Sequence, residues 1–199
     1  MKQKLLLASC NKKKLKELRE LFDMPTIEIV SLNDFDDIVE VQEDGETFEE
    51  NALKKAQGYA RQTRCLTLAD DSGLCVDHLG GKPGVFSARY AGVDKDDKSN
   101  CNKVLTEMKD CPRHKRTARF VAVVALAEPN KVIGVVRGEC EGEIAPEACG
   151  NNGFGYDPIF YYRPFGATFG EIDPAKKHAV SHRAQALEKA KVLLQEYMR

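Results

Sequence analysis

Residues 67–90, TLADDSGLCVDHLGGKPGVFSARY, contain the strand and turn signals around which the chain is organised. An apolar strand at residues 66–69 runs directly into two adjacent carboxylates, Asp70 and Asp71, followed by a serine and a glycine. Because Asp, Ser and Gly favour turns, we expect the strand to end here. The two acids would then lie at the rim of a sheet, where ligand crevices form in α/β folds.

A second short apolar run, residues 74–76, is followed by a segment rich in glycine and proline at residues 80–84. This segment contains too many helix and strand breakers to be packed core, so we expect a loop. An ordinary turn without chemistry is the plain alternative at residues 70–73. The other motifs of the chain decide between the two interpretations.

The composition excludes several classes of protein. The length of 199 residues suits one large domain or two tightly packed lobes, and the apolar content of 42% excludes a disordered chain. Thirty basic and 31 acidic residues leave a net charge of −1, which argues against nucleic-acid binding driven by charge. The seven cysteines form no C-x-x-C pair, so zinc ribbons and thioredoxins lose support, and scattered thiols suit a reducing cytoplasm.

The amino terminus superficially resembles a lipoprotein signal, but its apolar part is only residues 5–8. An export signal needs an apolar stretch of roughly 7–15 residues, so we interpret residues 4–8 as a first strand. The longest apolar run, residues 120–127, is too short to cross a bilayer. We therefore expect no membrane association and a cytoplasmic protein.

A polar loop follows the first strand and leads into a helix predicted at residues 12–22. The loop and the helix start contain Ser9, Cys10, Asn11, Lys12, Lys13 and Lys14. Backbone N–H groups at a helix start together with lysines suit a phosphate group. A solvated lysine run is an equally open interpretation, and the glycines of a Walker A loop are absent.

A strand at residues 27–32 precedes an irregular acidic segment that contains Glu43. Thr47, with Glu50 three positions later, matches the capping-box pattern and predicts a long helix. We expect its apolar residues to be buried and its polar residues, including Asn51 and Lys55, to face outward. An acid near Glu43 could reach Asp70 and Asp71, although ordinary capping acids are the favoured interpretation of this segment taken alone.

The second half of the chain predicts a helix at residues 94–109 and a long hairpin at residues 117–127 and 132–144. Residues 120–127 are apolar throughout, which is typical of a strand covered on both faces. A strand at residues 158–162, a helix starting at Asp173 and a terminal helix at residues 181–198 complete the chain. The alternation of strands and helices predicts an α/β fold with a mixed, twisted central sheet flanked by helices.

The loop at residues 146–157 ends with Phe154 between two glycines, so its ring is a candidate stacking platform for a base. A phenylalanine tucked into the core is the alternative. Lys177, His182 and Arg183 lie at or just before the start of the terminal helix. Such a cluster of cations favours an anionic or carbonyl-rich ligand.

Several of these motifs occur in the same order and spacing in one known family. They are SCN at residues 9–11 with Lys14, TFEENA at 47–52 with KA at 55–56, ADDSGL at 69–74, GGKPG at 80–84 with SARY at 87–90, GFGYDP at 153–158 and SHR at 181–183. The chain closely resembles the Ham1-like inosine/xanthosine triphosphate pyrophosphatases over nearly its whole length. The resemblance implies a single domain at residues 1–199 that folds as two closely packed lobes with the active-site cleft between them. It also implies a homodimer.

The resemblance further implies hydrolysis of noncanonical purine nucleoside triphosphates (ITP, dITP and XTP) to the monophosphate and pyrophosphate. Asp71 resembles the family's general base, and Asp71 and Glu43 are the candidate ligands of Mg²⁺. The segment from Ser9 to Lys14, with Ser72 nearby, would hold the triphosphate. Phe154 would stack on the base, and Gly155, Tyr156 and Asp157 would line its edge. The residues that would recognise the base are Lys177, His182 and Arg183. No stable nucleic-acid partner is expected.

Two other functions stay open at this point. A Maf-like pyrophosphatase, which has a related fold, would act on other altered nucleotides. A non-catalytic nucleotide- or RNA-binding module would explain the lysine run and the loop aromatic. The adjacent acids Asp70 and Asp71 speak against this module, because they repel a polyanion unless a metal ion intervenes.

Overall fold

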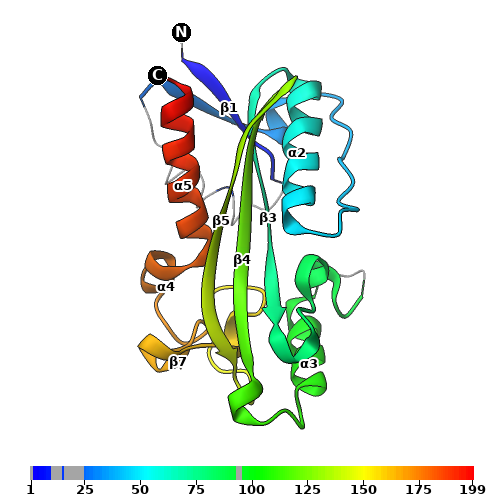
Figure 1. The fold of residues 1–199 in the computed structure, drawn as a ribbon, viewed down its shortest axis with the longest axis vertical. Helices are drawn as coiled ribbons and strands as arrows, with labels where there is room; N and C mark the ends of the chain where they lie inside the picture. The colour runs from blue at the N-terminus through cyan, green and yellow to red at the C-terminus, as the bar shows by residue number, and fades with distance from the viewer. Residues whose placement is uncertain (1, 10–14, 16–24, 93–95) are drawn as a thin grey trace. The chain divides into compact units, whose positions relative to one another are not determined.

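The computed structural model describes residues 2–9, 15, 25–92 and 96–199. Apart from residue 15, the helix predicted at residues 12–22 lies outside this part. The described strands form a seven-stranded sheet in the order β2-β1-β3-β4-β5-β6-β7 (Figure 1). Strand β1 pairs in parallel with β2 and β3, whereas β5 and β6, and β6 and β7, pair antiparallel. The strands are β1 (Gln3–Leu7), β2 (Ile27–Ser31), β3 (Leu66–Val76), β4 (Thr117–Glu128), β5 (Lys131–Ile144), β6 (Phe160–Tyr162) and β7 (Ala167–Thr168).

The helices of the described part are α2 (Phe48–Thr63), α3 (Asp97–Glu107), α4 (Pro174–Val180) and α5 (His182–Tyr197). The predicted caps are present: Thr47 accepts the N–H of Glu50 at the start of α2, and Asp173 accepts the N–H of Ala175 at the start of α4. Only half of the capping box forms, because the Glu50 carboxylate accepts from Glu46 instead of Thr47. None of the described helices is long and apolar enough to cross a membrane.

The chain divides into two compact units. The first consists of residues 1–71, 122–137 and 185–199, and the second of residues 72–121 and 138–184. Strands β3, β4 and β5 each pass from one unit into the other, and the boundary within β3 falls between Asp71 and Ser72.

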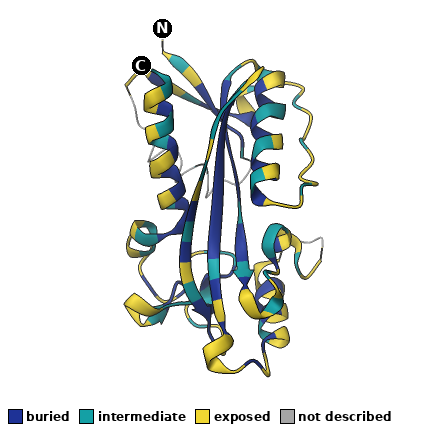
Figure 2. Ribbon diagram, viewed as in Figure 1, coloured by how far each residue is buried: buried dark blue, intermediate teal, exposed yellow. Residues whose placement is uncertain are grey.

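In the first unit, α2 and α5 lie on opposite sides of the strands (Figure 1). Leu5 and Leu7 of β1 belong to a cluster with Leu187 and Leu194 of α5. Leu6, between them, is also fully buried, and strand alternation directs it to the other face. In Figure 2 the ribbons of the central strands are largely dark blue, the colour of buried residues. This double burial explains why residues 5–8 form an unbroken apolar run.

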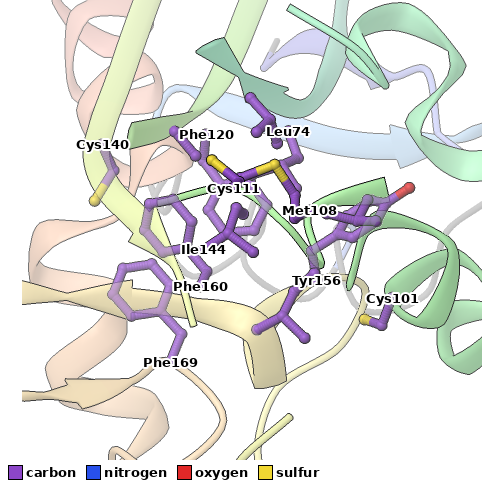
Figure 3. Packing of buried hydrophobic residues seen from close by; sticks show 14 of the residues in the cluster. Leu74, Cys101, Met108, Cys111, Phe120, Cys140, Ile144, Tyr156, Phe160 and Phe169 are labelled. Atoms are coloured by element: carbon purple, nitrogen blue, oxygen red, sulfur yellow. The ribbon is translucent and has the colours of Figure 1, made fainter. Parts of the chain in front are cut away.

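The core of the second unit is aromatic. Phe120 of β4 has its ring centroid 4.4 Å from that of Phe160 on β6, and Phe160 lies 5.0 Å from Phe169 (Figure 3). Residues 120–127 of β4 are buried throughout, which confirms the prediction that this strand is covered on both faces. The long hairpin β4–β5 is confirmed as well, with Pro129 and Asn130 as its turn.

The turn predicted at residues 70–73 is wrong, because β3 continues without interruption from Leu66 to Val76. The glycine signal has another physical cause. A Cβ on Gly73 would lie 2.3 Å from Oγ of Ser87 and 2.6 Å from the carbonyl oxygen of Gly84. The same Ser87 hydroxyl accepts the N–H of Leu74 at 2.9 Å. Gly73 therefore permits a close approach of the loop to the strand, and Asp70 and Asp71 lie within the sheet instead of at its rim.

Candidate active site

An acidic cluster in the first unit surrounds the ammonium group of Lys55. Its Nζ lies 2.8 Å from Oε2 of Glu43 and 3.7 Å from Oδ1 of Asp71. Asp70 and Asp71 are only 3% and 8% exposed, and Lys55 is 8% exposed. The predicted metal ligands Asp71 and Glu43 are thus both within reach of one cation.

The helix α2 supplies the groups that face these acids. Asn51 and Lys55 are four residues apart, so they lie on one face of the helix. Asn51 donates from Nδ2 to Oδ2 of Asp71 at 3.1 Å, and Lys55 faces Oδ1 of the same carboxylate. The prediction that Asn51 and Lys55 face outward is therefore wrong. They border the apolar stripe of Phe48, Ala52 and Ala56, and the acids of β3 provide polar partners on that side.

The electrostatics of the cluster keep Lys55 charged. Burial lowers the pKa of Lys55, but the carboxylates of Asp70, Asp71 and Glu43 raise it, and the net pKa lies above the ordinary value of 10.5. A buried ammonium among acids is stabilised by their combined charge. The cluster therefore combines several carboxylates with one permanent cation at neutral pH.

The parallel pairing of β1 with β3 ends just before the predicted phosphate loop and just before the acids. Leu7 pairs with Leu68, and the N–H of Ala8 donates to the carbonyl of Leu68 at 2.8 Å. The N–H of Ser9 donates back to the carbonyl of Leu7 at 3.0 Å, so the strand register ends before Ser9. The other predicted phosphate contacts lie outside the described residues: Cys10, Asn11, Lys12, Lys13 and Lys14.

A second cluster, in the second unit, surrounds the half-buried ring of Phe154. The ammonium nitrogen of Lys177 lies 4.7 Å from the ring centroid, and the guanidinium carbon of Arg183 lies 5.5 Å from it. Lys177 also lies 2.5 Å from Oδ2 of Asp157, which is 1% exposed. The structure thus brings together four predicted base-binding residues from three segments of the chain.

The backbone around Phe154 is held by several hydrogen bonds. The N–H of Phe154 donates to Oδ2 of Asp157 at 2.8 Å, and the N–H of Gly155 donates to Oδ2 of Asp97 at 2.7 Å. Gly153 and Gly155 both have positive φ, at 77° and 60°, a conformation that glycine adopts without strain. Burial raises the pKa of Asp157, while the charge of Lys177 opposes this shift.

The remaining predicted residues have mixed surroundings. Arg183 donates to Oγ of Ser72 at 3.3 Å, which joins a predicted phosphate contact to a predicted base contact. His182 is 5% exposed, and its ring stacks on Phe120 at a centroid distance of 4.8 Å. Tyr156 belongs to the aromatic core, where its hydroxyl donates to the carbonyl of Ser87 at 2.7 Å (Figure 3).

Sequence reasoning missed three residues that hold these clusters. Asn51 and Lys55 could have been recognised from their four-residue spacing beside an apolar stripe, with an acid pair on the following strand. Asp97 gave no such signal, because an exposed acid in the first turn of a helix is ordinary. Among the described residues, no group of three or more His, Cys, Asp and Glu side chains is placed to hold a metal ion.

Comparisons with known proteins agree with the sequence motifs. A model of the Ham1 family matches residues 5–193. A dITP/XTP pyrophosphatase of Desulforamulus reducens is 51% identical over 191 residues, which cover 96% of this chain and 95% of that protein. A dITP/XTP pyrophosphatase of Bacillus cereus is 48% identical over 199 residues, with 99% and 97% coverage.

The fold agrees equally well with a solved structure. A HAM1 protein from Coxiella burnetii superimposes with a TM-score of 0.90 at 43% identity, and the match covers 98% of this chain and 99% of that one. This similarity confirms the predicted α/β fold with a mixed sheet and flanking helices. The chain belongs to the Ham1 family.

Proposed function

We propose that this chain hydrolyses the noncanonical purine nucleoside triphosphates ITP, dITP and XTP to the nucleoside monophosphate and pyrophosphate, and so removes deaminated purines from the nucleotide pool. Its relatives at about 50% identity are named dITP/XTP pyrophosphatases and match almost its full length. The structural observation that supports the proposal most strongly is the convergence of Glu43 and Asp71 on one ammonium group.

The chemical problem of this reaction is charge, because water must attack a polyanion. Cations at the phosphates reduce the repulsion and stabilise the charge that develops in the transition state. In this chain the lysines from Lys12 to Lys14 and the buried Lys55 would supply part of that charge. Ala8, which precedes this loop, bonds to Leu68 of β3, two residues before Asp70, and this supports the assignment of the loop that Ser9 begins to the triphosphate.

The donor set of the acidic cluster fits Mg²⁺. This ion prefers carboxylate oxygens, needs only one or two of them, and completes its shell with waters and phosphate oxygens. Asp71 and Glu43 would hold it, since both carboxylates already face one cation, the ammonium group of Lys55. When bound, Mg²⁺ supplies positive charge at the phosphates.

Asp71 is the proposed catalytic residue. Its carboxylate is buried, and Asn51 and Lys55 face its two oxygens and fix its orientation. A carboxylate held in this way can orient a water molecule or accept its proton as the water attacks. The attack would fall on the α-phosphate, and pyrophosphate would leave.

The cluster around Phe154 is the proposed base site. An aromatic ring face suits stacking on a purine. Lys177, held by Asp157, and Arg183 are donors suited to the oxygen at C6 of hypoxanthine and xanthine. Adenine has an amino group at this position, so donors aimed there would be left unpaired, which disfavours ATP.

We propose further that residues 1–199 act as one domain and that the protein is a cytoplasmic homodimer without a stable nucleic-acid partner. The scattered thiols and the net charge of −1 support the compartment and the absence of a nucleic-acid partner. Family resemblance supports the homodimer.

Identification of the products tests the proposed reaction. Purified protein with ITP and Mg²⁺ should release IMP and pyrophosphate, separated by anion-exchange chromatography. Release of IDP and orthophosphate would mean that the bond between the β- and γ-phosphates is cleaved, which would contradict the proposed reaction. Binding of ITP without any Mg²⁺-dependent turnover would favour a nucleotide-binding module instead.

A further inference from the structure

Asn51 connects two acidic parts of the first unit. It is 1% exposed, and a buried polar side chain must find hydrogen-bond partners. Its Nδ2 donates to Oδ2 of Asp71 at 3.1 Å, and its Oδ1 accepts the N–H of Gly45 at 2.8 Å. One amide thus joins β3 to the loop that contains Glu43.

The chemistry of the partners fixes the orientation of this amide. The backbone N–H of Gly45 can only donate, so it must meet the carbonyl oxygen of Asn51. The ionised carboxylate of Asp71 can only accept, so it must meet the amide nitrogen of Asn51. A flipped amide would lose both bonds. An isosteric replacement that is only a donor or only an acceptor would lose one of the two bonds.

Gly45 shows how closely the loop approaches the helix. A Cβ at this position would lie 2.7 Å from Oδ1 of Asn51 and 2.8 Å from Cβ of Glu50. Real Cβ atoms do not come this close to other atoms, so a side chain would push the loop away. The absence of a side chain at Gly45 thus preserves the bond to Asn51.

Lys55 makes a parallel connection one helical turn further along α2. It contacts Glu43 at 2.8 Å and faces Asp71 at 3.7 Å. The two connections differ in charge: Lys55 competes with a bound cation for the same carboxylates, whereas the neutral amide of Asn51 does not. Asn51 can therefore hold Asp71 and the Glu43 loop in place while both acids face a metal ion.

We infer that Asn51 is a positioning residue that holds Asp71 and the loop of Glu43 in the arrangement that binds a divalent cation. This inference rests on the proposed function and adds a residue to it. Groups that orient metal ligands typically change metal affinity or activity by about 10–100-fold when they are removed. Both polar atoms of Asn51 are bonded within the protein, so its loss should leave substrate affinity largely unchanged.

Two variants test the inference. Asn51→Leu keeps the branching and the number of heavy atoms and removes both hydrogen bonds. Asn51→Ser leaves room for water if the leucine variant does not fold. The affinity for Mn²⁺, measured by electron paramagnetic resonance on nucleotide-free protein, should fall about 10-fold or more. With ITP, kcat should fall by a similar factor at saturating substrate, while KM changes less than about threefold.

Lys54→Gln is the matched control. Lys54 and Asp44 form an exposed ion pair that joins the same loop to the same helix without reaching Asp71. This variant should bind Mn²⁺ and turn over ITP like the wild type. Gly45→Ala, whose Cβ would meet Asn51 and Glu50, should also weaken Mn²⁺ binding.

The outcomes separate this inference from the proposed function. If the Asn51 variants bind Mn²⁺ and hydrolyse ITP like the wild type, the positioning role is wrong. A fall in melting temperature with unchanged Mn²⁺ affinity would assign Asn51 a purely structural role and would also overturn the inference. If the wild type binds Mn²⁺ but does not hydrolyse ITP, the proposed function fails, while the effect on Mn²⁺ affinity still tests the role of Asn51.

Discussion

Oε2 of Glu43 lies 2.8 Å from the ammonium nitrogen of Lys55, although the two residues belong to a loop and a helix. The same nitrogen lies 3.7 Å from Asp71 on β3. Three separate segments of the first unit therefore meet at one buried cation. This arrangement explains how acids that are distant in sequence can act on one ligand.

Replacement of Lys55 by methionine should destabilise the fold in a pH-dependent way. The variant leaves buried acids without their cation, and the unfolding free energy should fall by roughly 1–3 kcal/mol at pH 8. Partial exposure of Glu43 favours the lower part of this range. Urea unfolding of both proteins measures the difference.

The sign of the pH dependence follows from the raised pKa of Lys55. The stabilisation by its charge is fully present below the ordinary lysine pKa of about 10.5 and is lost as the pH rises through the higher pKa of the folded state. The wild type and Lys55→Met should therefore approach each other in stability above pH 10.5. Lys54 is the exposed neighbour of Lys55, and Lys54→Met should have the same free energy of unfolding as the wild type at pH 8 and above pH 10.5. If the wild type and Lys55→Met differed in unfolding free energy by the same amount at pH 8 and in strong alkali, this account would be contradicted.

Replacement of Asp71 by asparagine should abolish turnover without unfolding the protein. The change removes the charge that binds a metal ion or accepts a proton, and keeps the shape of the side chain. Pyrophosphate release from ITP should fall by about 10²–10⁴-fold, and circular dichroism should stay unchanged. Asp44→Asn, in the exposed ion pair on the Glu43 loop, serves as the control. Near-normal pyrophosphate release by Asp71→Asn would refute the assignment.

Replacement of Phe154 by alanine should weaken substrate binding. Stacking of one base on an aromatic ring contributes about 1–3 kcal/mol, so KM for ITP should rise roughly 5–150-fold. Steady-state kinetics measure this change. Phe165, an exposed aromatic that pairs with Tyr162, offers a control for the loss of a ring elsewhere. The same KM in Phe154→Ala and the wild type would exclude a stacking role.

Much of the fold could be predicted because local signals agreed with the packing. The apolar run at residues 120–127 is buried on both faces, and Thr47 and Asp173 cap their helices as expected. The short strand β7 was not predicted. Its two residues are defined by pairing with β6, which no local pattern reveals.

The candidate site was harder to predict, because tertiary contacts override local propensity. The DDSG run resembles a turn, yet β3 passes straight through it. Position 73 requires glycine because Ser87 and Gly84 approach its backbone closely. Both residues lie more than ten positions away in the sequence, so no local pattern reveals this contact. Lys55 appears exposed on a helical wheel and becomes buried only because acids on another element face it.

The substrate preference of the wild-type enzyme tests the central claim most directly. Pyrophosphate release should be measured with ITP, dITP, XTP, ATP and modified pyrimidine triphosphates, each with and without Mg²⁺. We predict Mg²⁺-dependent hydrolysis of the three keto purine nucleotides, with kcat/KM at least ~100-fold above that for ATP. Equal hydrolysis of ATP and ITP, or a preference for the modified pyrimidines, would contradict the account.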